Sequence, residues 1–162
     1  MQSASTWALA QSIVDKAGAE GVVITAAESC TGGLVSGALT DVPGSSAVLD
    51  RSFITYSNEA KTEMLGVPTA LIEQYGAVSQ PVAKAMAIGA VHNSRADLAV
   101  SITGIAGPTG GNAIKPVGLV WFGLASSDGV LRAERRVFRE GGRDFVRGRA
   151  VETALRLILR AI

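Results

Sequence analysis

The chain of 162 residues is long enough to bury one ordinary core, so residues 1–162 are expected to form a single domain. Hydrophobic residues make up 48% of it and aromatic residues only 5%, a profile typical of buried strands and Ala-rich helices packed on a sheet. The net charge of +1 gives no reason to expect nucleic acid or a membrane as a partner. One cysteine excludes an intrachain disulfide and a zinc site built from several cysteines.

The location is expected to be cytoplasmic. No run approaches the roughly 18 consecutive apolar residues that a transmembrane helix requires. The N-terminal stretch “MQSASTWALAQSIVDKAG” lacks the basic start and the uninterrupted apolar centre of a signal peptide.

The first elements alternate between helix and strand. A helix is predicted over about 5–17, followed by an apolar strand over 21–27, a helix over 31–42 and a β-branched strand over 47–57. The apolar stripe of the first helix is predicted to consist of Trp7, Ala10, Val14 and Ala17.

The middle of the chain is predicted to be helical. Asn58 is a suitable N-cap for a helix through about residue 67, and 71–75 forms a short helical turn. Ser79, with Pro81 behind it, opens a helix to about Asn93. Its apolar face is predicted to contain Val82, Met86 and Ala90.

The last part adds strands and a closing helix. Strands are predicted over 97–104 and 117–126, separated by a glycine-rich loop, and “SDG” turns the chain into a returning strand over 130–138. The final helix spans about 143–161. It is predicted to place inward Val146, Ala150, Ala154, Leu157 and Ile158.

Alternating helices and strands predict an α/β fold, a three-layer α/β/α sandwich, and the late hairpin makes its mostly parallel sheet mixed. Ligands of such sheets bind beyond the carboxyl ends of the strands. Three segments fall at such ends: “ESCTGG”, “TYSNEAK” and “TGIAGPTGG”.

The first segment offers Ser29 as a nucleophile. A strand-to-helix turn directs the free N–H groups of the new helix at a bound oxyanion or phosphate, and Gly32 and Gly33 permit close approach. The segment alone favours the simpler interpretation that Ser29 or Thr31 is a helix N-cap. It does not match the G-x-S-x-G motif.

Cys30 is the alternative nucleophile. Thiol catalysis commonly uses a histidine, and His92, near the end of a predicted helix, is the one histidine of the sequence. We expect instead that Cys30 is a small buried residue and that His92 interacts with the helix end.

A serine without histidine can use lysine as its base. Lys61 lies on the first turn of a predicted helix, where the positive helix end favours a neutral amine. Tyr56 precedes it at a strand end, where its hydroxyl could hydrogen-bond the amine. The alternative is that Lys61 is an exposed residue beside Glu59 and Glu63.

The glycine-rich loop can present backbone N–H groups to an anion, although a structural turn explains it equally. Its candidate binding residues are Thr103, Gly104, Gly107, Gly110 and Gly111. The arginines of “RAERRVFRE” and “GGRDFVRGRA” indicate a solvated face, and the alternative is that one of them meets an anionic substrate. Metal-ligand spacing is absent, so no metal or cofactor is expected.

Taken in order, the segments “TAAESCTGG”, “TYSNEAK”, “YGAVS”, “SITGIAGPTGG” and “KPVGLVWFG” resemble the nicotinamide-nucleotide amidases, the carboxy-terminal domain family of the competence-damage-inducible protein CinA. The resemblance runs from about Val22 to Phe122, with weaker agreement in “GGRDFVR” and the final helix. It implies an α/β/α sandwich that hydrolyses the carboxamide of nicotinamide mononucleotide in pyridine nucleotide recycling.

The resemblance further implies that Ser29 is the nucleophile, Lys61 its base and Tyr56 the partner of that base, without metal. Substrate contacts are then expected from the nucleophile turn, the glycine loop and Arg143. The contacts of the turn are Cys30, Thr31, Gly32 and Gly33. The expected partner is a small nucleotide, and family habit favours a homo-oligomer. A non-catalytic nucleotide-binding domain linked to competence and an amidase for another small amide are the alternatives.

Overall fold

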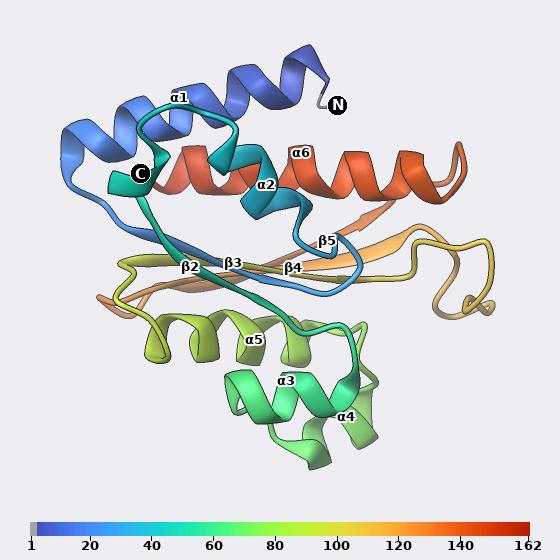
Figure 1. Cartoon of the computed structure of the whole chain (residues 1–162). Coiled ribbons are helices and arrows are strands. Elements are labelled where there is room, and N and C mark those ends of the chain that lie inside the picture. Colours follow the sequence, from blue (N-terminus) through green and yellow to red (C-terminus); the bar gives the residue numbers. More distant parts are fainter. Residues whose placement is uncertain (1–2) are drawn as a thin grey trace.

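The computed structural model describes residues 3–162 as a three-layer α/β/α sandwich (Figure 1). The strands are β1 (Ile24–Glu28), β2 (Leu49–Ile54), β3 (Leu98–Gly104), β4 (Leu119–Ser126) and β5 (Leu131–Val137). The helices are α1 (Ala4–Glu20), α2 (Leu34–Thr40), α3 (Asn58–Leu65), α4 (Thr69–Tyr75), α5 (Gln80–His92) and α6 (Arg143–Ala161), with a 3₁₀ turn at Ser45–Ala47. The predicted fold class is confirmed.

The five strands form one mixed sheet in the order β2-β1-β3-β4-β5. β1 pairs in parallel with both β2 and β3, whereas β3–β4 and β4–β5 are antiparallel. Four of the five strands therefore point the same way, and β4 alone is reversed. The predicted hairpin is the β4–β5 ladder, and the antiparallel pairing of β3 with β4 is an addition from the structure.

Each face of the sheet carries its own core. The helices α1, α2 and α6 cover one face, and α3, α4 and α5 cover the other (Figure 1). The first core includes Ile13, Ile102, Phe122 and Leu155, and the second includes Phe53, Leu65 and Met86. None of the helices in residues 3–162 is long and apolar enough to cross a membrane.

Most predicted elements are present, with corrections at their ends. α1 continues through Gly18 to Glu20 and ends at Gly21, whose φ of 69° suits a residue without a side chain. The N-cap of α3 is Ser57, whose side chain accepts from Ala60 N–H, so the prediction of Asn58 is wrong.

Two residues that were predicted to lie in the core are not fully buried. Trp7 is 46% exposed, and Ile13 occupies the buried stripe of α1 beside Ala10 and Ala17. In α6, Leu157 is half-buried while Leu155 is fully buried. The predicted inward residues of α5, by contrast, are all buried.

The carboxyl ends of β1, β2 and β3 meet at one edge of the sheet, on the right of Figure 1. The chain leaves these strands through the three segments singled out in the sequence. The first turn of α6 also lies at this edge, which brings Arg143 to it.

Candidate active site

A pocket of about 290 Å³ opens at this edge. It is lined by Ser29, Cys30, Tyr56, Asn58, Lys61, Ala77, Val78, Thr103, Gly104, Ile105, Ala106, Gly107, Thr109, Gly110 and Arg143. The structure thus brings Ser29, Tyr56 and Lys61 together with most of the glycine loop. The predicted contacts Thr31, Gly32, Gly33 and Gly111 lie outside the pocket wall.

Ser29 follows the last residue of β1, and its N–H donates to Ile102 O of β3 at 2.9 Å. This bond extends the pairing of the two strands by one residue, so the serine is held on a rigid element. Its side chain is 9% exposed and faces the pocket.

Lys61 approaches from α3. Because Ser57 caps this helix, Lys61 lies on its first turn, on the same face as the buried Leu65 four residues later. The lysine is only 1% exposed, so the expectation that it lies exposed beside Glu59 and Glu63 is wrong.

The amine of Lys61 has three oxygen neighbours. Its Nζ lies 3.1 Å from Ser29 Oγ, 2.8 Å from Thr55 O and 3.4 Å from Ser57 O. A neutral amine has two N–H groups and one lone pair. The two carbonyls can accept the N–H groups, which leaves the lone pair for the Ser29 hydroxyl.

Burial lowers the pKa of Lys61 from its ordinary value of 10.5, because a charged ammonium loses hydration there. The negative forms of Cys30 and Glu59 act in the opposite direction but more weakly. The lowered pKa favours the neutral amine, and this amine contacts the Ser29 hydroxyl, which is the arrangement that a general base needs.

Tyr56 has a different partner from the one expected. Its hydroxyl accepts a hydrogen bond from Arg143 Nη2 at 2.8 Å, and Arg143 Nη1 donates to Gly107 O at 2.9 Å. No Tyr56–Lys61 hydrogen bond occurs in this structure. Arg143 instead joins the tyrosine to the glycine loop across the mouth of the pocket.

Glu28, to which the sequence assigned no role, binds the start of α2. Its carboxylate is fully buried and accepts hydrogen bonds from Gly33 N (3.0 Å), Val35 N (3.1 Å), Ser36 N (2.9 Å) and Ser36 Oγ (2.6 Å). Glu28 therefore performs the capping that was considered for Ser29 or Thr31, and that interpretation is wrong.

This capping changes the expected oxyanion contacts. Gly33 N–H is taken by Glu28, and Gly32 N–H donates to Ser29 O at 3.0 Å. In residues 3–162, the turn retains two N–H groups that donate to no other residue, those of Cys30 and Thr31.

Cys30 itself is 5% exposed, and burial raises the pKa of its thiol to about 11. His92 is exposed at the far end of α5, about 18 Å along the helix from the pocket end. The structure therefore does not bring the pair together. Cys30 is a small buried residue, as expected.

The glycine loop closes on the nucleophile turn. A Cβ atom at Gly104 would lie 2.7 Å from Val120 Cγ2 and 3.1 Å from Cys30 Sγ, so no side chain fits between them. Thr103 donates from its hydroxyl to Ala77 O at 2.8 Å, which fixes the opposite wall.

Arg147 is a residue that sequence reasoning missed. It donates from Nε to Cys30 O at 3.1 Å and from Nη2 to Thr31 O at 3.3 Å. Arg147 lies four residues after Arg143, which places both arginines on one face of α6. This spacing is the sequence feature that could have indicated Arg147 as a site residue.

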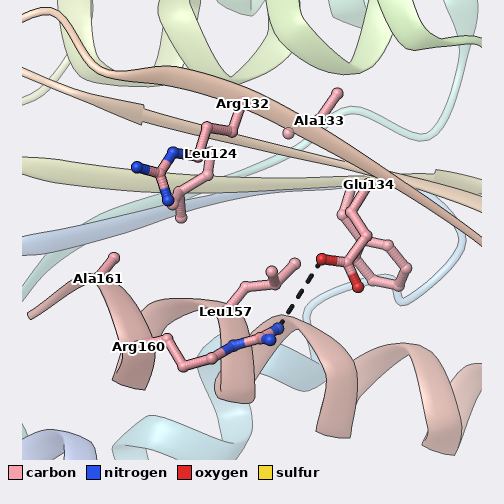
Figure 2. Close-up of a pocket in the computed structure, with 9 residues that line it drawn as sticks. Leu124, Arg132, Ala133, Glu134, Leu157, Arg160 and Ala161 are labelled. Carbon is pink, nitrogen blue, oxygen red and sulfur yellow. Dashed lines mark ion pairs between the residues drawn. The ribbon is translucent and has the colours of Figure 1, made fainter.

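A second hollow lies between β4, β5 and the end of α6 (Figure 2). Its wall includes an ion pair of Arg160 with Glu134 at 3.8 Å over Leu157. It contains no predicted site residue and lies at the opposite end of α6 from Arg143. Across residues 3–162, no group of three His, Cys, Asp or Glu side chains is placed to hold a metal ion.

Comparison with known proteins adds an independent result. Residues 6–162 match the family described as CinA C-terminal domain. A nicotinamide-nucleotide amidohydrolase PncC from Enterobacter agglomerans is 54% identical over 142 residues, covering 88% of this chain and 86% of that protein. The PncC of Escherichia coli K12 is 53% identical over 140 residues, covering 86% and 84%.

Longer relatives match through one part only. A putative competence-damage inducible protein of Caldicellulosiruptor bescii is 49% identical over 139 residues, which are 86% of this chain and 33% of that protein. Among solved structures, the competence/damage inducible protein CihA from Agrobacterium tumefaciens superposes with a TM-score of 0.97 at 44% identity, covering 99% of this chain and 97% of that one. The chain belongs to the CinA C-terminal domain family.

Proposed function

We propose that this protein hydrolyses the carboxamide of nicotinamide mononucleotide, giving nicotinate mononucleotide and ammonia. The observation that carries the proposal is the 3.1 Å contact between Ser29 Oγ and the buried amine of Lys61. The substrate comes from the relatives named nicotinamide-nucleotide amidohydrolase, which share more than half of the aligned residues.

The first half of the reaction forms an acyl-enzyme. Neutral Lys61 takes the proton of the Ser29 hydroxyl while Oγ attacks the amide carbon. The carbonyl oxygen becomes an oxyanion, which is stabilised by the N–H group of Cys30, a residue of the pocket wall, and by that of Thr31 in the peptide directly behind it; one such donor is worth roughly 3–4 kcal/mol in a characterised hydrolase.

The second half releases the two products. The Lys61 ammonium gives its proton to the amide nitrogen, the C–N bond breaks, and ammonia leaves. Water then loses a proton to Lys61 and attacks the ester carbon, Ser29 departs with that proton, and the carboxylic acid formed releases its own proton to solvent to become the carboxylate. Tyr56 acts from the pocket mouth, where its hydroxyl can hydrogen-bond the departing ammonia.

The nucleotide end of the substrate is proposed to bind at the glycine loop. Ala106, Gly107, Thr109 and Gly110 line the pocket, two of them without a side chain to cover the backbone, and Arg143 supplies a positive charge beside them. A phosphate monoester matches both features, because backbone N–H groups and a guanidinium both donate to its oxygens.

The test is ammonia release from nicotinamide mononucleotide by wild type and Ser29→Ala. We expect wild type to be active and the variant to lose more than about 1,000-fold in kcat. Absence of release by folded wild type would contradict the amidase. In that case, binding of the unaltered nucleotide by calorimetry would support a non-catalytic nucleotide-binding domain.

The third reading is hydrolysis of another small amide. A panel of pyridine carboxamides and amino-acid amides distinguishes this alternative from our proposal, because our proposal predicts a large loss of kcat/KM when the phosphate is removed from the substrate. Light scattering on the same samples tests the proposed homo-oligomer.

A further inference from the structure

We propose that Arg147 is a positioning residue that orients the peptide groups of the nucleophile turn, residues Ser29 to Gly33. The catalytic consequence of this role rests on the proposed amidase function. Arg147 does not line the pocket, so it does not touch substrate there. Its guanidinium instead holds the carbonyls of Cys30 and Thr31, the two residues that follow Ser29.

Peptide geometry links these carbonyls to the N–H groups of the turn. In a planar trans peptide the C=O and the next N–H point in opposite directions. When Arg147 draws the Cys30 carbonyl to itself, the N–H of Thr31 is turned away from α6. Thr31 N–H is one of the two donors assigned to the oxyanion.

The next peptide confirms this relation. Arg147 also holds Thr31 O, and the following N–H, that of Gly32, donates to Ser29 O at 3.0 Å on the other side of the turn. The guanidinium thus holds two successive peptide groups, the Cys30 carbonyl by itself and the Thr31 carbonyl together with Leu34 N–H, which donates to the same oxygen at 3.1 Å. Its planar fork suits this task, because a lysine ammonium offers no rigid pair of donors.

Glu28 fixes the other end of the same turn. Its carboxylate holds Gly33 N–H and the first residues of α2, while Arg147 holds the carbonyls just before them. The turn from Ser29 to Gly33 is therefore held by a buried anion through its donors and by a cation through its acceptors. Loss of Arg147 releases the part that contains the oxyanion donors.

The test uses Arg147→Met, with Arg149→Met as the matched control. Arg149 lies on the same helix, pairs with Glu152 at 2.8 Å, and does not contact the turn. We expect Arg147→Met to lower kcat about 10- to 100-fold with KM within about twofold, since misplaced groups slow the chemical step without removing substrate contacts. Arg147→Lys restores part of the rate, and Arg149→Met retains wild-type kinetics.

Amide hydrogen exchange provides a measurement that does not depend on activity. Arg147→Met should accelerate exchange at Thr31 and Gly32 by at least about tenfold and leave β3 amides unchanged, whereas Arg149→Met changes neither. A wild-type kcat in Arg147→Met, or unchanged exchange at both amides, overturns the positioning role. If Arg147→Met does not fold, Arg147→Lys is compared with Arg149→Lys by the same criteria. If wild type releases no ammonia, the proposed function fails, and the exchange data alone decide this inference.

Discussion

Lys61 Nζ and Ser29 Oγ lie 3.1 Å apart, although 32 positions separate the two residues in the chain. The serine comes from the end of β1 and the lysine from the first turn of α3, so the contact depends on the parallel pairing of β1 with β2. Thr55 N–H donates to Glu28 O at 2.8 Å and so fixes the segment that leads into α3. The base is therefore aligned through the pairing of β2 with β1, and the nucleophile through the pairing of β1 with β3.

The first prediction concerns the pH dependence of the rate. Only neutral Lys61 can accept the serine proton, so kcat/KM rises with pH and levels off above the pKa of Lys61. Burial lowers this pKa, so the plateau begins below 10.5, the ordinary value for lysine. Rates of ammonia release from about pH 5.5 to 9.5 measure the profile. Lys61→Arg, which stays protonated, should lack this limb and lose nearly all activity; an unchanged profile in that variant argues against the role.

The second prediction concerns the stability of the fold and also follows from the lowered pKa of Lys61. The folded state binds the Lys61 proton less tightly than the unfolded state, so between the lowered pKa and 10.5 the unfolded chain carries more protons. The free energy of unfolding contributed by Lys61 therefore rises with pH across this window. Urea unfolding of wild type and Lys61→Met at about pH 7.5, 8.5 and 9.5 tests it: the difference should move in favour of wild type as pH rises. A constant difference would show that the amine has an ordinary pKa.

The positions of elements were predictable from the sequence because local signals specify them. Ser79 with Pro81 opens α5, and α6 begins at Arg143 as expected. The burial of Lys61 was not predictable from its own helix, since Glu59 and Glu63 beside it indicate a solvated face. Its environment comes from Thr55 and Ser29, the residues that directly follow β2 and β1, and no pattern within α3 encodes such contacts.

The same reason explains the errors within the candidate site. Ser29 and Thr31 are good N-cap residues by type, but Glu28 caps α2 from within the preceding strand. Likewise, a Tyr56–Lys61 contact was inferred from their closeness in sequence. Arg143, 87 residues from Tyr56, is the partner that the fold supplies.

The third prediction concerns Glu28. Replacement by Gln removes the buried charge and places an NH₂ group against backbone N–H donors, so the free energy of unfolding should fall by about 3 kcal/mol. Ser36→Ala removes one hydrogen bond to the same carboxylate and should cost about 1 kcal/mol. Urea unfolding measures both. Equal effects would mean that the carboxylate contributes no more than its bond to the Ser36 hydroxyl.

The fourth prediction concerns the contact between the glycine loop and the nucleophile turn. A Cβ at Gly104 would lie 2.7 Å from Val120 Cγ2, 3.0 Å from Leu119 O and 3.1 Å from Cys30 Sγ, so Gly104→Ala forces a shift between β4 and the residue next to Ser29. We expect kcat to fall about tenfold or more. Gly148→Ala is the control, because nothing lies within 4 Å of the added methyl group and alanine favours a helix interior. It should keep the wild-type rate; if Gly104→Ala does so too, the packing at this point does not position the serine.

The last prediction tests which wall of the pocket binds phosphate. Arg143 donates to Tyr56 Oη and Gly107 O, and it is the cation of the pocket wall other than the base Lys61. Arg143→Met should raise KM for nicotinamide mononucleotide about tenfold or more, because a charge-assisted hydrogen bond to phosphate is worth about 1.5–3 kcal/mol. The same variant should change kcat/KM for nicotinamide riboside, which lacks the phosphate, by less than about threefold. Equal losses for the two substrates would instead place the effect of Arg143 on Tyr56 and the amide end, because only a phosphate contact distinguishes the nucleotide from the nucleoside.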